Sequence, residues 1–62
     1  MDKWEELKQL CDECGFPEPR LIMKMWVTIV EIPDHYNRCY YDIDTSVQMC
    51  INYCKEYLNE SS

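Results

Sequence analysis

The longest apolar run in the chain, RLIMKMWVTIVEI over residues 20–32, says most about the fold. Its second half is rich in β-branched residues, which fit a pleated strand better than a helix. Pro19 and Pro33 bracket the run, and neither fits inside a central strand or a helix interior. The run therefore predicts one strand over residues 20–32. A helix over residues 21–25 is the alternative, since Leu and Met favour helices.

Alternation along this strand separates two faces. The odd positions from Leu21 to Ile29 are apolar, so we predict that they face the core. The even positions are mixed, with Lys24 and Thr28 among apolar side chains, so we predict that they face outward. This assignment leaves an apolar outer surface around Trp26, unless one helix crosses the sheet to cover it.

A second strand is predicted over residues 38–43, where Cys, Tyr and Ile follow a turn cluster at residues 33–37. We expect an antiparallel hairpin in which Ile32 lies opposite Arg38. In that register the odd positions of both strands share one face, which makes the predicted core self-consistent.

Two amphipathic helices complete the predicted fold. The first covers residues 3–14, with Asp2 as its N-cap and Gly15, the only glycine, just beyond its end. The second covers residues 46–59, with Thr45 as its N-cap. The sequence thus predicts a small α+β domain of order α-β-β-α, in which both helices pack on one face of a two-stranded antiparallel hairpin.

The length of 62 residues predicts a single domain, residues 1–62, with a small core. The net charge of −6 argues against binding of nucleic acid or anionic membranes, and it favours another protein as partner, including one with a basic surface. The sequence shows no basic and apolar leader and no run long enough to cross a bilayer. We therefore expect a cytoplasmic protein with reduced thiols.

The five cysteines have the strongest potential for chemistry. Cys11 and Cys14 share one face of the first helix, and Cys50 and Cys54 share one face of the second. All four fall in phase with the apolar stripes, which favours reduced thiols in the core. Two alternatives stay open. One is a zinc site formed by all four thiolates, which would stabilise so small a domain, and the other is a disulfide between the helices.

The sequence contains no recognisable catalytic constellation. His35, the only histidine, lies beside Asp34 in the predicted turn, and neither a nucleophile elbow nor a phosphate-binding loop accompanies it. We therefore expect a protein that is not an enzyme.

The outer face of the predicted hairpin is the best candidate for function, because exposed apolar patches with Trp, Tyr and Arg are typical of interfaces. Small size, acidity and a residue bias typical of AT-rich coding resemble small inhibitors encoded by phages or mobile elements. We expect a non-catalytic inhibitor or regulator of a host protein. The alternatives are a zinc-stapled structural module and a homodimer formed by edge-strand pairing. The predicted partner-binding residues are Ile22, Lys24, Trp26, Val30, Arg38 and Tyr40.

Overall fold

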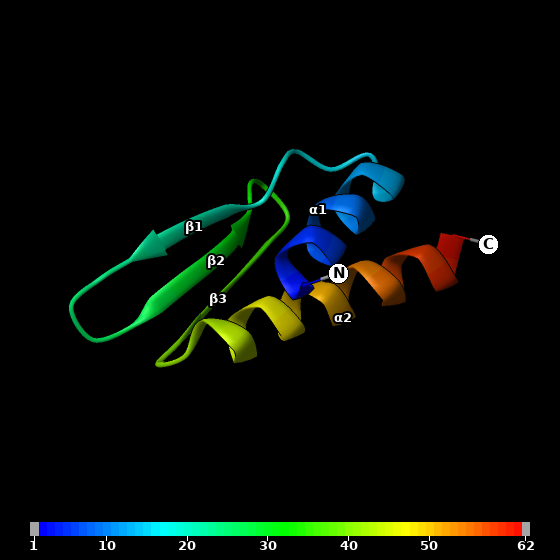
Figure 1. Cartoon of the computed structure of the whole chain (residues 1–62). Coiled ribbons are helices and arrows are strands. Elements are labelled where there is room, and N and C mark those ends of the chain that lie inside the picture. Colours follow the sequence, from blue (N-terminus) through cyan, green and yellow to red (C-terminus); the bar gives the residue numbers. More distant parts are fainter. Residues whose placement is uncertain (1, 62) are drawn as a thin grey trace.

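The computed structural model describes residues 2–61 of the chain and the side chains of residues 2–60. Two helices and three strands follow in the order α1 (Lys3–Cys14), β1 (Arg20–Met23), β2 (Thr28–Ile32), β3 (Tyr36–Tyr40) and α2 (Ile43–Ser61) (Figure 1). The strands form one antiparallel sheet of order β1-β2-β3. The predicted α+β class is confirmed. The predicted two-stranded hairpin is wrong, because the long apolar run folds back on itself.

The predicted long strand is interrupted at residues 24–27, where the chain turns from β1 into β2. The Lys24 N–H donates to the carbonyl of Val27 across this turn (2.9 Å). The turn contains no glycine, proline, asparagine or aspartate, so the usual turn residues do not reveal it. The length of the predicted strand does reveal it, because residues 20–32 exceed the usual strand length of about 3–10 residues.

The turn also inverts the predicted assignment of faces in β2. Odd-numbered residues of β1 lie opposite even-numbered residues of β2, and the reverse also holds. Leu21, for example, lies opposite Val30, and Ile22 lies opposite Ile29. The even residues of β2 face the helices, and both Val30 and Ile32 are fully buried, whereas Ile29 is only half-buried. The predicted core face is therefore wrong for β2. For β1 the predicted side of the sheet is correct, because the odd residues of β1 lie on the helix side.

The second pair of strands is shifted by two residues from the predicted register. Ile32 lies opposite Tyr36, and Arg38 lies opposite Val30. β3 therefore begins and ends earlier than the predicted strand over residues 38–43. Because the shift is even, Arg38 still shares a face with the even residues of β2.

A tight turn over residues 33–35 accounts for this register. The His35 N–H donates to the carbonyl of Ile32 (3.0 Å), and Asp34 takes the left-handed conformation with φ of 66°. Proline followed by a residue of positive φ is typical of a type II turn. The predicted five-residue loop is therefore shorter in the structure, and strand pairing begins at Tyr36.

Helix α1 is capped at both ends as the sequence predicts. The Asp2 carboxylate accepts a hydrogen bond from the Glu5 N–H (2.9 Å). At the other end Gly15 takes the left-handed conformation with φ of 78°. The N–H groups of Gly15 and Phe16 donate to two carbonyls of the last helical turn, which completes a Schellman motif.

Helix α2 begins at Ile43, three residues before the predicted start. Its N-cap is Asp42, whose carboxylate accepts hydrogen bonds from the hydroxyl (2.7 Å) and the backbone N–H (3.0 Å) of Thr45. These hydrogen bonds hold the pKa of Asp42 below its usual value. The predicted cap, Thr45, instead lies in the first turn and reinforces the cap formed by Asp42.

The core lies between the sheet and the helices. Helix α2 packs across β2 and β3, and α1 packs on α2 (Figure 1). The buried Ser46 hydroxyl donates to the Thr28 carbonyl (3.2 Å) and fixes the first turn of α2 on the sheet. β1 extends beyond the helices. The buried apolar residues are Leu7, Cys11, Val30, Ile32, Val47, Cys50, Ile51 and Cys54.

Two isoleucines on opposite faces of β2 test the observed face assignment. Ile32→Ala removes a fully buried side chain, so we expect the free energy of unfolding to fall by about 2–5 kcal/mol. Ile29→Ala removes the same atoms from a half-buried position, so we expect a loss below about 1.5 kcal/mol. Urea denaturation followed by circular dichroism measures both. An equal or larger loss for Ile29→Ala would contradict the assignment.

Candidate protein-binding surface

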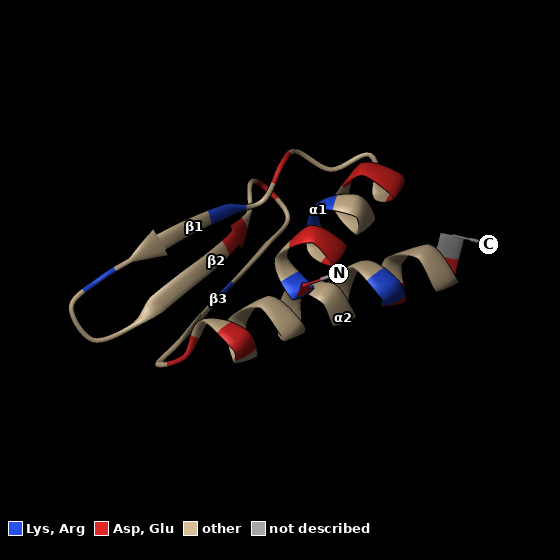
Figure 2. Ribbon diagram, viewed as in Figure 1, with Lys and Arg blue, Asp and Glu red and all other residues tan. Residues whose placement is uncertain are grey.

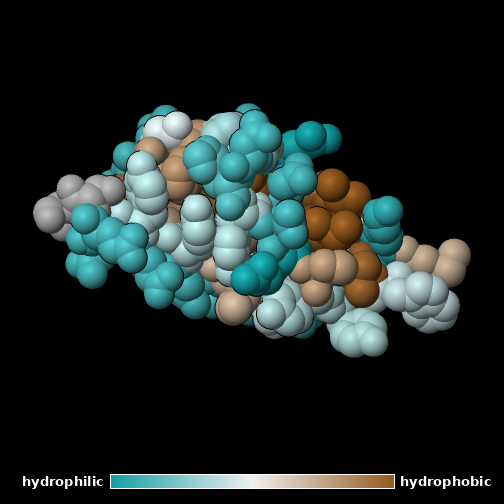
Figure 3. Space-filling view, turned by 180° about the vertical axis from the view of Figure 1, so that it is seen from behind, coloured by the Kyte–Doolittle hydropathy of each residue, from teal (hydrophilic) through white to brown (hydrophobic). Residues whose placement is uncertain are grey.

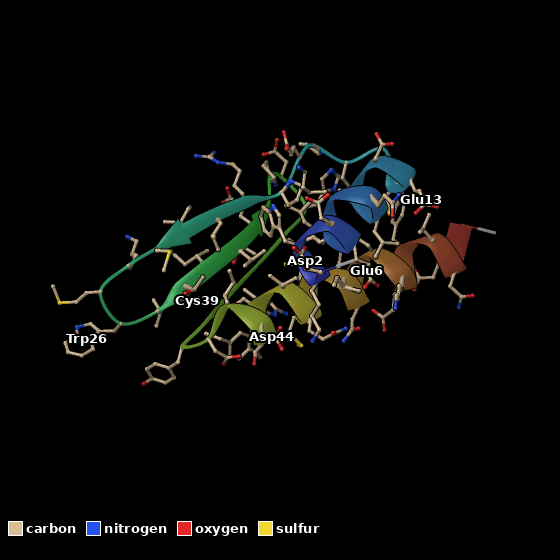
Figure 4. All side chains as sticks on the ribbon, in the orientation of Figure 1. Asp2, Glu6, Glu13, Trp26, Cys39 and Asp44 are labelled. Carbon is tan, nitrogen blue, oxygen red and sulfur yellow. The ribbon has the colours of Figure 1, made fainter. Side chains whose placement is uncertain are left out.

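The end of the sheet that carries the β1–β2 turn exposes large apolar side chains. Met25 and Trp26 form the tip, with 86% and 75% of their surfaces exposed, and Met23 is 75% exposed. Trp26 lies at the far end of the hairpin from α1 and the C-terminal half of α2 (Figure 4). We call this region the hairpin-end surface. It consists of Leu21, Met23, Met25, Trp26, Tyr40, Tyr41 and Ile43.

β1 contributes to this surface because no helix covers it. Leu21 lies beside the buried Val30, and Met23 lies beside the buried Thr28. Tyr40 lies on the other side of Thr28 in the same row. Helix α2 packs mainly on β2 and β3. The helix-side residues of β1, Leu21 and Met23, therefore form an exposed apolar surface beside the core, which we call the apolar shelf.

The start of α2 forms the second part of the hairpin-end surface. Tyr41 precedes the helix cap and is 85% exposed, and Ile43 is the first helical residue and is also exposed. The Ser46–Thr28 hydrogen bond holds this turn at the same end of the sheet as the hairpin. In Figure 3 apolar surface gathers over the strands toward this end, while the other end is largely hydrophilic.

The strands are less acidic than the helices. Residues 20–41 contain three cations, Arg20, Lys24 and Arg38, against two carboxylates, so ten of the twelve carboxylates lie elsewhere (Figure 2). The other three cations, all lysines, lie 3.1–3.8 Å from carboxylate oxygens. These ion pairs are exposed and add little stability. The negative net charge therefore lies on the helices and their connections, outside residues 20–41.

Three of the six predicted partner-binding residues belong to this surface or lie beside it, and a fourth lies in the core. Trp26 and Tyr40 belong to it, and Lys24 is exposed beside it. Val30 has no exposed surface and lies in the core, so its predicted contact with a partner is wrong. The reason is the turn at residues 24–27, which places the even residues of β2 under α2.

The other two predicted residues lie outside the hairpin-end surface. Ile22 is half-buried on the outer face of the sheet, opposite Ile29. The Arg38 guanidinium lies over the Tyr36 ring, with 4.3 Å between its central carbon and the ring centroid. It also donates to the Asn37 carbonyl (2.8 Å). The structure therefore does not bring Ile22 and Arg38 together with Trp26.

Five members of the hairpin-end surface are absent from the predicted set. A single strand over residues 20–32 assigns the odd positions to the core, which hides the exposure of the methionines and Leu21. Tyr41 and Ile43 are hidden because the predicted strand over residues 38–43 assigns its odd positions to the core. The excessive length of the predicted strand is the sequence feature that points to the missing turn. The five residues are Leu21, Met23, Met25, Tyr41 and Ile43.

The helix cysteines meet in the core without forming a four-thiolate cluster. The Sγ atoms of Cys11 and Cys54 are 4.0 Å apart, and the Cys14 thiol donates to the Cys54 carbonyl (3.7 Å). Cys50 turns toward the sheet and donates to the Val30 carbonyl (3.6 Å). Within residues 2–61, no group of three or more His, Cys, Asp or Glu side chains is arranged to hold a metal ion. This geometry favours reduced core thiols over the zinc alternative.

Burial keeps these thiols protonated. Desolvation, followed by repulsion from Cys11, raises the pKa of Cys50 to about 11. Desolvation is also the main cause of the raised pKa of Cys11, Cys14 and Cys54. Because the thiolate is both the nucleophile and the metal ligand, these groups are held in an unreactive form near neutral pH.

The predicted turn histidine belongs to an aromatic cluster at the opposite end of the sheet from Trp26. Its ring stacks on Phe16 with 4.1 Å between centroids, and Phe16 also contacts Tyr57 (4.8 Å). Tyr36 stacks on Tyr53 (4.3 Å). Aromatic pairs of this kind contribute about 0.5–1.5 kcal/mol each. The cluster therefore ties the β2–β3 turn to both helices, and His35 has a structural part in it.

No protein-family model, curated protein or solved structure matches this chain. In the described part of the chain, neither helix combines the length and apolar character needed to cross a membrane. Function is therefore inferred from the surface chemistry of the chain itself.

The cysteines are expected to differ widely in reactivity. Cys39 is exposed on β3 (Figure 4), so a thiol reagent such as DTNB should modify it first at neutral pH. Cys11, Cys50 and Cys54 should react only as the protein unfolds, because they are buried and their pKa values are raised. Cys39→Ser should remove the fast phase.

Two results would contradict this account of the thiols. One is a fast phase that persists in Cys39→Ser. The other is stoichiometric zinc in the purified protein, with loss of the circular dichroism spectrum when a chelator removes the metal.

Proposed function

We propose that this protein is a small binding module that acts as a non-catalytic inhibitor or regulator by occupying part of the surface of another protein. The hairpin-end surface carries the proposal. Of the eight exposed large apolar side chains among the described residues, seven belong to this surface, at the hairpin end or on the uncovered β1. Soluble monomers rarely leave such side chains together in water unless they bind a partner.

The residue types of this surface suit protein recognition. Trp26 and the two tyrosines supply large contact areas with few rotatable bonds, and such residues dominate binding hot spots. Met23 and Met25 have flexible, polarisable side chains that adapt to a partner surface. A tryptophan at the tip of a projecting hairpin is suited to enter a pocket on the partner.

The base of the surface is held in place by the fold. Val30 is fully buried beneath α2, and the Ser46–Thr28 hydrogen bond joins the helix to the strand that leaves the hairpin. The Asp42 cap fixes the adjoining turn. Preorganisation of this kind lowers the entropy that is lost on binding.

The acidic helices add a second element to the proposal. A partner with a basic surface near its binding pocket would be attracted to the helices, which raises the rate of association at low salt. The apolar contact itself would be made by the hairpin-end surface, whose neighbouring strands are not acidic.

Substitution at the tip separates binding from folding. Trp26→Asp changes a side chain that is 75% exposed, so we expect thermal unfolding to change little. We expect affinity for the partner to fall at least about tenfold, because a tip tryptophan is a typical hot spot. Titration calorimetry with the partner recovered from the source cells measures the loss.

Gln9→Asp is the matched control, since it adds the same charge at an exposed position of α1. Equal affinity of Trp26→Asp and Gln9→Asp for the partner would overturn the proposal. Sedimentation velocity tests the alternative partner, a second copy of the chain. A dimer that is lost in Trp26→Asp would replace the external partner with self-association.

A further inference from the structure

The outer strands of the sheet differ in how free their edges are. In β3 the Asn37 carbonyl accepts a hydrogen bond from the Arg38 guanidinium (2.8 Å), so a side chain of the strand itself occupies part of that edge. Among the hydrogen bonds of the described side chains, none reaches the backbone of β1. β1 is therefore the more open edge.

The hydrogen-bonding pattern identifies the free groups of β1. The Lys24 N–H donates to Val27, so these two residues form a hydrogen-bonded pair. Bonded and non-bonded pairs alternate along an antiparallel ladder. The N–H and C=O groups of Leu21 and Met23 consequently point away from β2. An added strand pairs with outward groups of this kind.

Charge distinguishes the strands that this edge can accept. Arg20 begins β1 and Lys24 directly follows its last residue, both on the face away from the helices and roughly 13 Å apart. Arg20 is 3.8 Å from Glu31 in an exposed pair, and Lys24 is exposed. An antiparallel second copy of β1, aligned over its full length, would place Arg20 opposite Lys24 twice. Like charges directly opposite are destabilising, whereas carboxylates there would be stabilising.

We propose that the β1 edge docks an extended segment of a partner protein, which pairs antiparallel with β1 and places a carboxylate opposite each of Arg20 and Lys24. Three apolar residues lie between the two carboxylates. One faces Ile22 on the outer face, and two lie against Leu21 and Met23 on the apolar shelf. This inference rests on the proposed function and defines the partner as a strand with the pattern acid, three apolar residues, acid.

The added strand would cover the part of the sheet that the helices leave open. Backbone hydrogen bonds to Leu21 and Met23 would supply affinity, and the flanking charges would supply specificity. The shelf is continuous with the hairpin tip, so one partner can contact both. Lysine on an edge strand also serves to prevent aggregation. A protective role alone predicts that no strand pairs with β1.

The probe is the peptide Thr-Glu-Val-Ile-Val-Glu-Thr, acetylated and amidated, added to the 15N-labelled full chain. We expect the largest NMR shift changes at the amides of β1, with slowed hydrogen exchange at Leu21 and Met23. Because the flanking contacts are ionic, we expect about a threefold or greater loss of affinity between low and physiological salt.

Two control peptides test pairing and charge. The first has proline in place of the first valine, which removes a backbone donor directed at β1. The second has lysine in place of both glutamates. We expect neither to bind the wild-type chain. Shifts of β1 that are equal for the acidic and basic peptides, or absent for the acidic one, would overturn the proposal and leave the edge charges with a protective role.

A charge reversal tests the contact at Lys24. Lys24→Glu should lose at least about fivefold in affinity for the acidic peptide, since an opposite-charge pair becomes a like-charge pair. Lys55→Glu makes the same change on α2 and should bind as the wild type does. Equal binding by both variants would contradict the assigned register.

The outcomes separate this inference from the proposed function. If Trp26→Asp no longer binds the partner and the acidic peptide causes no NMR shift changes in β1, only the proposed docking of a strand is contradicted. If Trp26→Asp still binds the partner and the peptide causes no shift changes, both the proposed function and the strand docking are contradicted. If the peptide pairs with β1 but Trp26→Asp keeps the partner, the edge and not the tip is the binding site, which overturns the proposed role of the hairpin-end surface.

Discussion

The packing of α2 across β2 and β3 decides which parts of this small protein become core and which become surface. Val30 lies under the helix, and the Ser46 hydroxyl and the Cys50 thiol both donate to carbonyls of β2. A helix covers only about two strands, because interhelical and helix–sheet spacings are near 10 Å and strands lie about 4.8 Å apart. With α1 packed on α2, the third strand is left beyond the helices.

The uncovered strand explains both the apolar surface and the proposed docking edge. Leu21 and Met23 lie on the core side of the sheet, yet they remain exposed because α2 packs mainly on β2 and β3. The turn that follows them places Met25 and Trp26 at the tip. A chain of 62 residues has few side chains to spare for a second covering layer. A partner that supplies this cover would therefore complete the structure as well as recognise it.

Local sequence rules predict the helices well and the sheet only in part. Asp2 and Gly15 mark the ends of α1, because capping depends on side chains and conformations that a sequence displays directly. The β1–β2 turn carries no such residues, and this one omission changes the strand count and inverts the face of β2. Alternation along the strand and the residue type identify Trp26 as a binding candidate, whereas the burial of Val30 follows only from the correct strand pairing.

The proposed contact between the hairpin tip and another protein can be detected in the cell by site-specific photocrosslinking. The chain would be produced in the source cells with p-benzoylphenylalanine in place of Trp26, or in place of Gln9 on α1 as the control. We expect a discrete crosslinked product from the position of Trp26 and none from that of Gln9. No product from the position of Trp26, or the same products from both, would contradict it.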